Sequence, residues 1–388
     1  MEECHLKSAI EPAHEATFHA RSYGFRSGRG THDAQEYVFL NLKGNSRRKS
    51  GPATNKKVIE LDIEKCFDTI SHKAILDRLI APQCVKSGLL KCLRAGTVDI
   101  KYPKNSNEVT IEGTPQGGVI SPLLANVALN GIEEICPSVR YADDMVFFIK
   151  DEDGLNRPQL ILRRVESFLA ERGMRMSQEK TRVTDPKEGF DFLGWNFRVQ
   201  SNGKCKSSPS KKNQEKFIEK MDSLRLDMKL SAEELVSKVA PIVRGWCNYH
   251  KYTDGSSVKR TMWFVNHALF KRFNKGKKTT YEEAVRMAKE ACPTVETKTN
   301  GFVMVKGNKS VYDGDITYWS KRNNSMYEGL KAQIIMKQRY VCNECGLKLL
   351  MSDDNAEIHH VDRNHANNRL DNLVALHRSC HMKLKMST

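Results

Sequence analysis

Long apolar stretches are missing from this sequence, which contains no run of about 18 or more apolar residues able to span a bilayer. The first residues also lack the charged-then-apolar leader of a secreted protein. We therefore expect a cytoplasmic or nucleoid-associated protein with no membrane partner. In such a reducing compartment the 11 cysteines would not form disulfides.

Acidic residues are scarce relative to basic ones. The 388 residues include 63 Lys and Arg against 47 Asp and Glu, a formal net charge of +16. The excess is concentrated in residues 204–278, where 18 Lys and Arg face 7 Asp and Glu. This clustering predicts a polyanionic partner, and nucleic acid is favoured over an anionic membrane. The length predicts two or three domains.

Apolar periodicity predicts the main elements of the first half. Residues 58–67 are typical of a buried strand that ends in carboxylates, and a helix is expected over residues 71–80. Ser121 and Pro122 favour the start of another helix. Two apolar stretches around Asp143 and Asp144 indicate a hairpin.

Later segments show other patterns. Residues 156–172 are predicted to be helical, residues 190–197 to form a pair of short aromatic strands, and the basic segment from residue 211 onward to form packed helices. The Gly- and Asn-rich region at residues 294–324 is expected to hold mixed short strands at best.

Three aspartates form the first candidate site. Asp143 and Asp144 lie in the turn of the predicted hairpin, and Asp62 lies at the end of the earlier strand. Paired magnesium ions require several carboxylate oxygens that converge from rigid elements, so a two-metal site is one interpretation. The alternative is that the Asp-Asp pair belongs to an ordinary solvated β-turn.

Two knuckles near the C-terminus form the second candidate site. Cys342 and Cys345 have two residues between them, and His377 and Cys380 repeat that spacing. Four such ligands suit tetrahedral zinc, and a structural zinc would stabilise a unit of about fifty residues. His377 is the less certain ligand of the four. The eight scattered cysteines are interpreted as packing residues.

Six motifs in order along the chain give a specific resemblance. They are SYGFRSGRGTHDA (22–34), VIELDIEKCFDTISH (58–72), GTPQGGVISPLLANVALN (113–130), YADD (141–144), GMRMSQEKT (173–181) and FLGW (192–195). Together they resemble the palm motifs of a group II intron reverse transcriptase and maturase, and RGWCNYHKY (244–252) resembles the thumb motif of that family. The resemblance implies an α+β multidomain fold with a right-hand polymerase palm.

The resemblance also implies roles for individual palm residues. Asp62, Asp143 and Asp144 would be the catalytic ligands of Mg²⁺, and Phe67 would be the aromatic gate under the incoming sugar, unless it is a core residue. Gln116 and Gly117 would lie along the templating pair, or only form a tight turn. Lys180 would act near the departing pyrophosphate, or be a surface lysine. Leu193 and Gly194 would belong to the primer grip.

EIHHVDRNHANNRLDNLVAL (357–376) followed by CHMKL resembles the HNH, or ββα-metal, nuclease motif. That resemblance implies that His360 is the general base and that His359 and His381 hold a divalent ion. Asn372 would orient the His360 ring. The alternative is a zinc site that only binds DNA.

Four domains are expected from these matches. They are a palm with partial fingers at residues 1–200, a helical thumb/maturase segment that binds RNA at 201–293, a linker or accessory DNA-binding region at 294–335, and an HNH domain at 336–388. Only 21 residues precede the SYGFR motif, and none matches the family's basic finger motifs, which are expected to bind the triphosphate.

The favoured hypothesis is a protein of intron splicing and mobility that uses Mg²⁺ and Zn²⁺. The maturase segment would bind intron RNA, the HNH domain would nick target DNA, and the palm would extend the freed end with deoxynucleotide triphosphates. The alternatives are a polymerase-deficient splicing maturase, or an HNH nuclease with a remnant palm.

Overall fold

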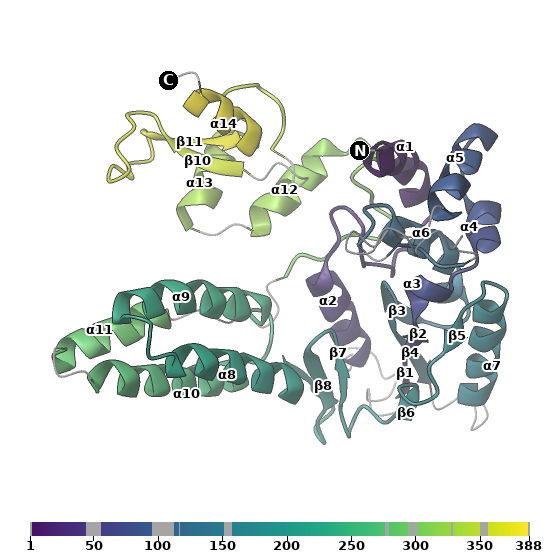
Figure 1. Cartoon of the computed structure of the whole chain (residues 1–388), viewed down its shortest axis with the longest axis horizontal. Coiled ribbons are helices and arrows are strands. Elements are labelled where there is room, and N and C mark those ends of the chain that lie inside the picture. Colours follow the sequence, from purple (N-terminus) through teal and green to yellow (C-terminus); the bar gives the residue numbers. More distant parts are fainter. Residues whose placement is uncertain are drawn as a thin grey trace, which may run out of the picture.

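The computed structural model describes residues 2–43, 56–94, 112–115, 117–150, 157–275, 279–293, 297, 302–326, 329–349 and 356–386. Figure 1 shows a mixed helix-and-sheet body, a bundle of long helices and a small C-terminal unit.

A four-stranded antiparallel sheet forms the centre of the first body. Its strands, in the order in which they lie side by side, are β3 (Ser138–Tyr141), β4 (Asp144–Lys150), β1 (Lys56–Leu61) and β6 (Arg182–Thr184). Residue Leu61 pairs with Met145, and Tyr141 pairs with Asp144 across a two-residue turn. The predicted hairpin is thus confirmed. The predicted strand at 58–67 is confirmed only in its first part, because β1 ends at Leu61, a short β2 (Ile63–Glu64) follows, and Phe67 already lies in the helix Cys66–Thr69.

Both faces of this sheet are covered, because its side chains alternate between two apolar cores. Ile59 and Phe147 contribute to one core, while Val58 and Phe148 contribute to the other. Strand periodicity places successive side chains on opposite faces, so near-continuous apolar runs suit a sheet that is buried on both sides.

Helices and short strands surround the sheet (Figure 1). They are α1 (Glu2–Glu15), α2 (Thr31–Leu42), α3 (Cys66–Thr69), α4 (His72–Arg78), α5 (Gln83–Arg94), α6 (Ser121–Leu129), the 3₁₀ turn Ile132–Glu134, α7 (Arg157–Ala170) and β5 (Arg175–Met176). The expected helices at 71–80, from Ser121 and over 156–172 are confirmed. The Ser71 hydroxyl caps α4 by accepting a hydrogen bond from the Ala74 N–H.

A second sheet joins the body to the bundle. Strands β7 (Phe190–Phe192), β8 (Trp195–Val199) and β9 (Cys205–Pro209) form an antiparallel meander, as the aromatic run predicted for its first two strands. Helices α8 (Lys211–Leu226), α9 (Ala232–Tyr249), α10 (Gly255–Asn274) and α11 (Tyr281–Ala291) then pack around their own apolar core. The Ser231 and Glu234 side chains form a capping box that fixes the start of α9.

The C-terminal unit is a ββα arrangement preceded by α13 (Gly329–Lys337). It consists of the antiparallel pair β10 (Ala356–His360) and β11 (Leu373–His377) and of α14 (Arg378–Met386). The small core of the unit includes Cys342, Ala375 and Cys380. The expected ββα fold is therefore present in the structure.

The expectation of short strands at best in residues 294–324 is wrong for the part that the structure describes. Residues 316–326 form α12 (Ile316–Met326), and no strand occurs among residues 302–326. The Arg322 guanidinium bonds to both Asp33 oxygens at 2.8 and 2.9 Å, and these side chains are only 2 and 1% exposed. Residues 302–322 are thus tied to the sheet-containing body.

Further contacts reinforce this attachment. The Arg29 guanidinium donates to the carbonyls of Gly307 and Lys309, both at 2.9 Å, and the Val305 N–H donates to Asp33 at 2.7 Å. The Trp319 ring packs against Gly28, where a Cβ would lie 2.6 Å from the indole. The segment is therefore built into the body rather than strung between two domains.

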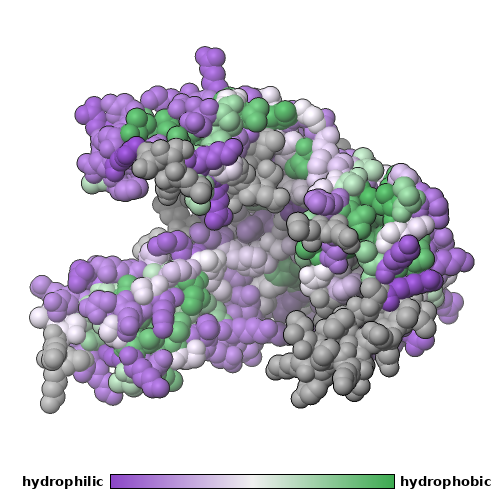
Figure 2. Space-filling model, turned by 45° about the horizontal axis from the view of Figure 1, so that its top comes forward, coloured by the Kyte–Doolittle hydropathy of each residue, from purple (hydrophilic) through white to green (hydrophobic). Residues whose placement is uncertain are grey.

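No helix in the described part of the chain is both long and apolar enough to cross a membrane. Figure 2 shows hydrophilic residues over most of the visible surface, with apolar residues gathered in small areas between them.

We predict that Arg322→Met releases residues 302–326 from the body, because it removes one partner of a buried ion pair. Such losses cost about 3–5 kcal/mol. Limited proteolysis should show faster cleavage in this segment than in the wild type. Lys321→Met, which replaces the exposed neighbour on the same helix, is the control and should leave the cleavage rate unchanged. Equal cleavage of the two variants would contradict the anchoring role.

Candidate active sites

The register of β1 and β4 brings the three predicted aspartates to one edge of the sheet. Asp62 follows Leu61, whose partner Met145 follows Asp144, and Asp143 lies in the adjoining turn. The Asp62 carbonyl also accepts a hydrogen bond from the Ser177 N–H at 2.9 Å, which fixes the backbone at the strand end. Carboxylates from three positions thus converge on rigid elements.

Electrostatics at this edge disfavour three bare negative charges. Burial, followed by the neighbouring charges of Asp143 and Asp62, raises the pKa of Asp144 to about 6. Burial also raises the pKa of Asp143. The exposed Lys180 ammonium lies 2.6 Å from the Asp62 carboxylate. Carboxylates held together against their own repulsion suit divalent cations, which would favour the ionised forms.

A buried charged network supports the turn that carries Asp143. Arg140 is 0% exposed, and its guanidinium donates to Glu133 at 2.6 Å and to Asn126 at 2.7 Å. It also donates to the carbonyl of Ala142 at 3.3 Å, and Ala142 has φ of 58°. A non-glycine residue in that region is uncommon and needs support from its surroundings. The buried hydrogen bonds of Arg140 supply that support.

The segment around Gly24 also contacts the turn. The Tyr23 N–H donates to the Arg140 carbonyl at 2.9 Å, and the Asn126 amide donates to the Gly24 carbonyl at 2.8 Å. A Cβ on Gly24 would lie 2.3 Å from the Ala142 nitrogen. Glycine is therefore required here by close backbone approach.

The proposed gate and template turn are connected by backbone hydrogen bonds. The Thr114 N–H donates to the Phe67 carbonyl at 2.6 Å, and the Gly113 N–H donates to the Ile70 carbonyl at 2.7 Å. Phe67 is partly buried and packs against the core. Gly117 has φ of 83° with open space at its Cβ position, so its glycine suits the turn conformation. Gln116 lies outside the described residues.

The predicted primer-grip turn is held by the helical bundle. Leu193 and Gly194 have φ of 50° and 81°. The Tyr249 hydroxyl donates to the Leu193 carbonyl at 2.7 Å, and the Tyr249 ring stacks on Trp195 with centroids 4.4 Å apart. The Trp246 indole donates to Asn213 at 2.8 Å. The thumb-like motif at 244–252 is thus a structural junction between bundle and sheet.

The second candidate site is the cluster of Cys342, Cys345, His377 and Cys380. Their ligand atoms all lie within 4.8 Å of one another. Although burial opposes it, hydrogen bonds from the backbone at Cys345, His377 and Glu344 lower the pKa of the Cys342 thiol to about 7. Three sulfurs and one imidazole at this spacing are a donor set that suits tetrahedral zinc.

The predicted nuclease residues lie on the neighbouring strand pair. The rings of His359 and His381 have centroids 5.2 Å apart, and His360 lies beside His365 at 5.0 Å. The Asn372 amide donates to Asp362 at 2.7 Å and to the Asn367 carbonyl at 2.9 Å. Asn372 therefore braces the loop that follows His360.

Several residues of these sites were not singled out from the sequence. The Glu357 carboxylate lies 2.6 Å from Nδ1 of His381, and the Asn368 amide oxygen lies 3.2 Å from Nε2 of His360. Glu357 precedes His359 by two positions on a strand, which puts both on one face and is a signal that could have been used. Arg140 is a charged residue within an otherwise apolar strand, and this pattern could likewise have indicated a residue of the site.

Comparison with known families gives three matches. Residues 3–197 match the family described as reverse transcriptase (RNA-dependent DNA polymerase). Residues 214–287 match the maturase-specific domain of group II introns, and residues 342–386 match HNH endonuclease. All three families act on nucleic acids, and the first and third use divalent metal ions.

Similar proteins carry related names. Maturase-like protein 1 of Euglena gracilis is 26% identical over 356 residues, which cover 89% of this chain and 71% of that protein. The Euglena longa protein of the same name is 32% identical over 72% of this chain, which spans 58% of that relative. Group II intron-encoded protein LtrA of Lactococcus lactis subsp. cremoris is 23% identical over 92% of this chain and 75% of that protein.

Among solved structures, an apo telomerase from Candida tropicalis covers 87% of this chain at 11% identity and a TM-score of 0.41, with 59% of that chain covered. A foamy viral protease-reverse transcriptase with an RNA/DNA hybrid covers 67% of this chain and 30% of its own, at 16% identity and a TM-score of 0.33.

We predict that Gly24→Ala destabilises the body, because the added methyl group overlaps the backbone of the turn that carries Asp143. Overpacking of this kind costs about 1–3 kcal/mol. The urea midpoint of unfolding should fall. Gly88→Ala in α5, where a Cβ meets nothing within 4 Å, is the matched control and should leave the midpoint unchanged or raise it. A wild-type midpoint for Gly24→Ala would refute the close contact.

Proposed function

Because the chain belongs to the reverse transcriptase (RNA-dependent DNA polymerase) family, we propose that its palm copies RNA into DNA at Asp62, Asp143 and Asp144. Its maturase and HNH domains are those of a group II intron-encoded protein of splicing and mobility. The observation that carries the proposal is the convergence of three carboxylates at one sheet edge, where burial raises the pKa of Asp143 and Asp144.

The aspartates would hold Mg²⁺ and position a primer end and a deoxynucleotide triphosphate. Bound Mg²⁺ would supply activation of the primer 3′-hydroxyl and neutralisation of the leaving pyrophosphate. Phe67 would contact the incoming sugar, and Gln116 and Gly117 would lie along the templating pair. Lys180, which pairs with Asp62, would contact a departing phosphate group. Leu193 and Gly194 would contact the primer strand.

The C-terminal unit would nick target DNA. His360 would accept a proton from the attacking water, since a neutral imidazole near pH 7 can serve as a general base. His359 and His381 would hold a divalent ion that supplies stabilisation of the charge on the scissile phosphate. Asn372 would keep the adjoining loop, and hence His360, in place through Asp362.

Cys342, Cys345, His377 and Cys380 would hold structural zinc, which supplies cross-linking between the start of the unit and α14. The basic bundle would bind intron RNA, which the positive charge of residues 204–278 supports. We retain residues 1–200, 201–293, 294–335 and 336–388 as the proposed palm, thumb/maturase, accessory and HNH domains. The ion pair of Arg322 with Asp33 supports grouping the third proposed domain with the first.

The second candidate function is splicing support alone, with a palm that serves as an RNA scaffold. The direct support of the primer-grip turn by Tyr249 would suit a rigid scaffold as well as an active polymerase.

Two variants separate the proposed activities. Asp143→Ala should abolish primer extension on poly(rA) with oligo(dT) because it removes a metal ligand, while nicking of plasmid DNA continues. His360→Ala should have the opposite pattern. Each variant thus controls the folding of the other site, and Asp191→Ala, at an exposed palm position, should retain both activities. Wild-type product that does not exceed that of Asp143→Ala would favour the scaffold function.

Zinc content tests the cysteine and histidine cluster. Purified protein should contain zinc by elemental analysis, and Cys345→Ser should lose most of it and expose the C-terminal unit to protease, because metal binding is coupled to folding. Cys84→Ser, at an exposed cysteine of α5, should keep the zinc and the protease resistance. Full zinc content in Cys345→Ser would remove that ligand from the proposed set.

A further inference from the structure

Helix α10 has one buried face and one exposed face of different chemistry. Its buried residues, Val258, Thr261, Val265, Leu269 and Phe273, pack into the bundle. Trp263 and Phe264 do not pack into the bundle, since they are 61 and 48% exposed. Two adjacent aromatic rings in water indicate a surface that is used for contact.

The exposed rings are organised rather than scattered. Trp263 stacks on His267 with centroids 5.3 Å apart and an interplanar angle of 9°. Phe264 meets Trp263 edge-to-face at 5.1 Å, and the Arg260 guanidinium lies 6.0 Å from the Phe264 ring. The Trp263 side chain is already restricted by its stacking on His267, so it loses little conformational entropy when a further flat group stacks on it.

The charge of this face selects the partner. Lys259, Arg260 and Lys271 are exposed beside the rings, and α10 contains no acidic residue. A cationic helix face with exposed aromatics matches the combination of phosphates and flat bases in an unpaired nucleic-acid strand. An apolar protein partner would match the rings but not the basic rim.

A hollow next to Phe264 adds room for a base. It has a volume of about 280 Å³ and lies between α8 and α10, with Ile218, Met221, Ala268 and Leu269 along its walls. Arg225 at its edge is paired with Asp222 at 2.8 Å.

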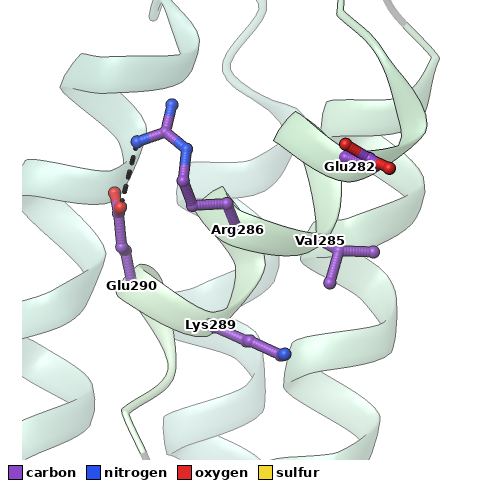
Figure 3. Close-up of a pocket in the computed structure, with 5 residues that line it drawn as sticks. All are labelled: Glu282, Val285, Arg286, Lys289 and Glu290. Atoms are coloured by element: carbon purple, nitrogen blue, oxygen red, sulfur yellow. Dashed lines mark hydrogen bonds and ion pairs between the residues drawn. The ribbon is translucent and has the colours of Figure 1, made fainter.

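A second hollow on the bundle lacks this chemistry. It is lined by a single helix, α11, and Figure 3 shows Arg286 and Glu290 turned toward each other, paired at 3.1 Å. Glu282 and Lys289 add one charge of each sign, so the lining of this hollow has no aromatic ring and no net positive charge.

We propose that Trp263, Phe264 and His267 form a stacking platform on α10 that binds unpaired nucleotides of a nucleic-acid strand, with Lys259, Arg260 and Lys271 contacting its phosphates. The platform deepens the RNA-binding role proposed for the bundle and rests on it. It is separate from the aspartates and from the HNH residues, so neither chemical step depends on it.

The chain allows a direct optical test. Trp195 and Trp319 are buried and Trp246 is partly buried, so Trp263 is the tryptophan most open to quenching. A single-stranded RNA of about 12 nucleotides should quench tryptophan fluorescence in the wild type. The quenching should be absent in Trp263→Ala, and affinity measured by anisotropy should fall about 5- to 150-fold. Trp263→Phe should recover most of the affinity.

Controls separate stacking from general attraction. Tyr281→Ala removes another exposed aromatic of the bundle and should bind RNA as the wild type does. A fully paired duplex should bind more weakly than the single strand at equal salt, and a DNA strand of the same sequence shows whether the sugar matters. Equal affinity in Trp263→Ala and wild type, or binding without quenching, would overturn the platform.

Two other outcomes also decide between explanations. Loss of self-association in Trp263→Ala, with RNA affinity unchanged, would assign the face to a protein contact and overturn the platform. Salt-dependent RNA binding by the wild type tests the bundle's proposed role separately, because that binding can persist when the Trp263 variant shows no effect.

Discussion

The antiparallel pairing of β1 with β4 is the constraint on which the palm depends. Side chains on a strand alternate between faces, so a slip of one residue would turn the carboxylates away from each other and exchange the two apolar cores. The register is secured because both faces of the sheet are buried. Ile59 and Phe147 fill one core, and Val58 and Phe148 fill the other. Packing energy spread over the whole sheet thus positions a few oxygen atoms at its edge.

Charge is handled differently at the edge and beneath it. Partial burial first, and the neighbouring charges of Asp143 and Asp62 second, raise the pKa of Asp144 to about 6. Next to this edge, the completely buried side chains of Arg140 and Glu133 form an ion pair at 2.6 Å. Arg140 also donates to the carbonyl of Ala142 in the turn that carries Asp143. A buried ion pair that also hydrogen-bonds to this turn restricts the geometry of the turn.

Much of this arrangement could be predicted from local sequence. Strand alternation, Ser71 and Pro122 mark β1, α4 and α6, and the apolar runs around Asp143 mark the hairpin. The spacing of Cys342, Cys345, His377 and Cys380 predicts a cluster that the structure brings together. These features can be predicted because they depend on the periodicity and spacing of residues that lie close together in the sequence.

Contacts between distant residues could not be predicted in this way. Helix α12 forms in a segment of turn-forming composition because Trp319 packs on Gly28 and Arg322 pairs with Asp33, 289 positions away in the sequence. The roles of Arg140 and Tyr249 likewise depend on partners that only the folded chain supplies. The exposure of Trp263 and Phe264 could not be predicted either, because helical spacing alone does not show which face of a helix its neighbours cover.

The attachment of residues 302–322 to the body determines how the domains are connected. The helical bundle leaves the palm after β9 and is followed by a segment that is again fastened to α2 through Asp33. The bundle is therefore connected to the same body at both of its ends, and it does not lie between that body and the C-terminal unit. A movement of the bundle relative to the body would therefore have to be accommodated at both of its connections, the one after β9 and the one before residue 302. The C-terminal unit follows this fastened segment along the chain, because α12 is the element that precedes α13.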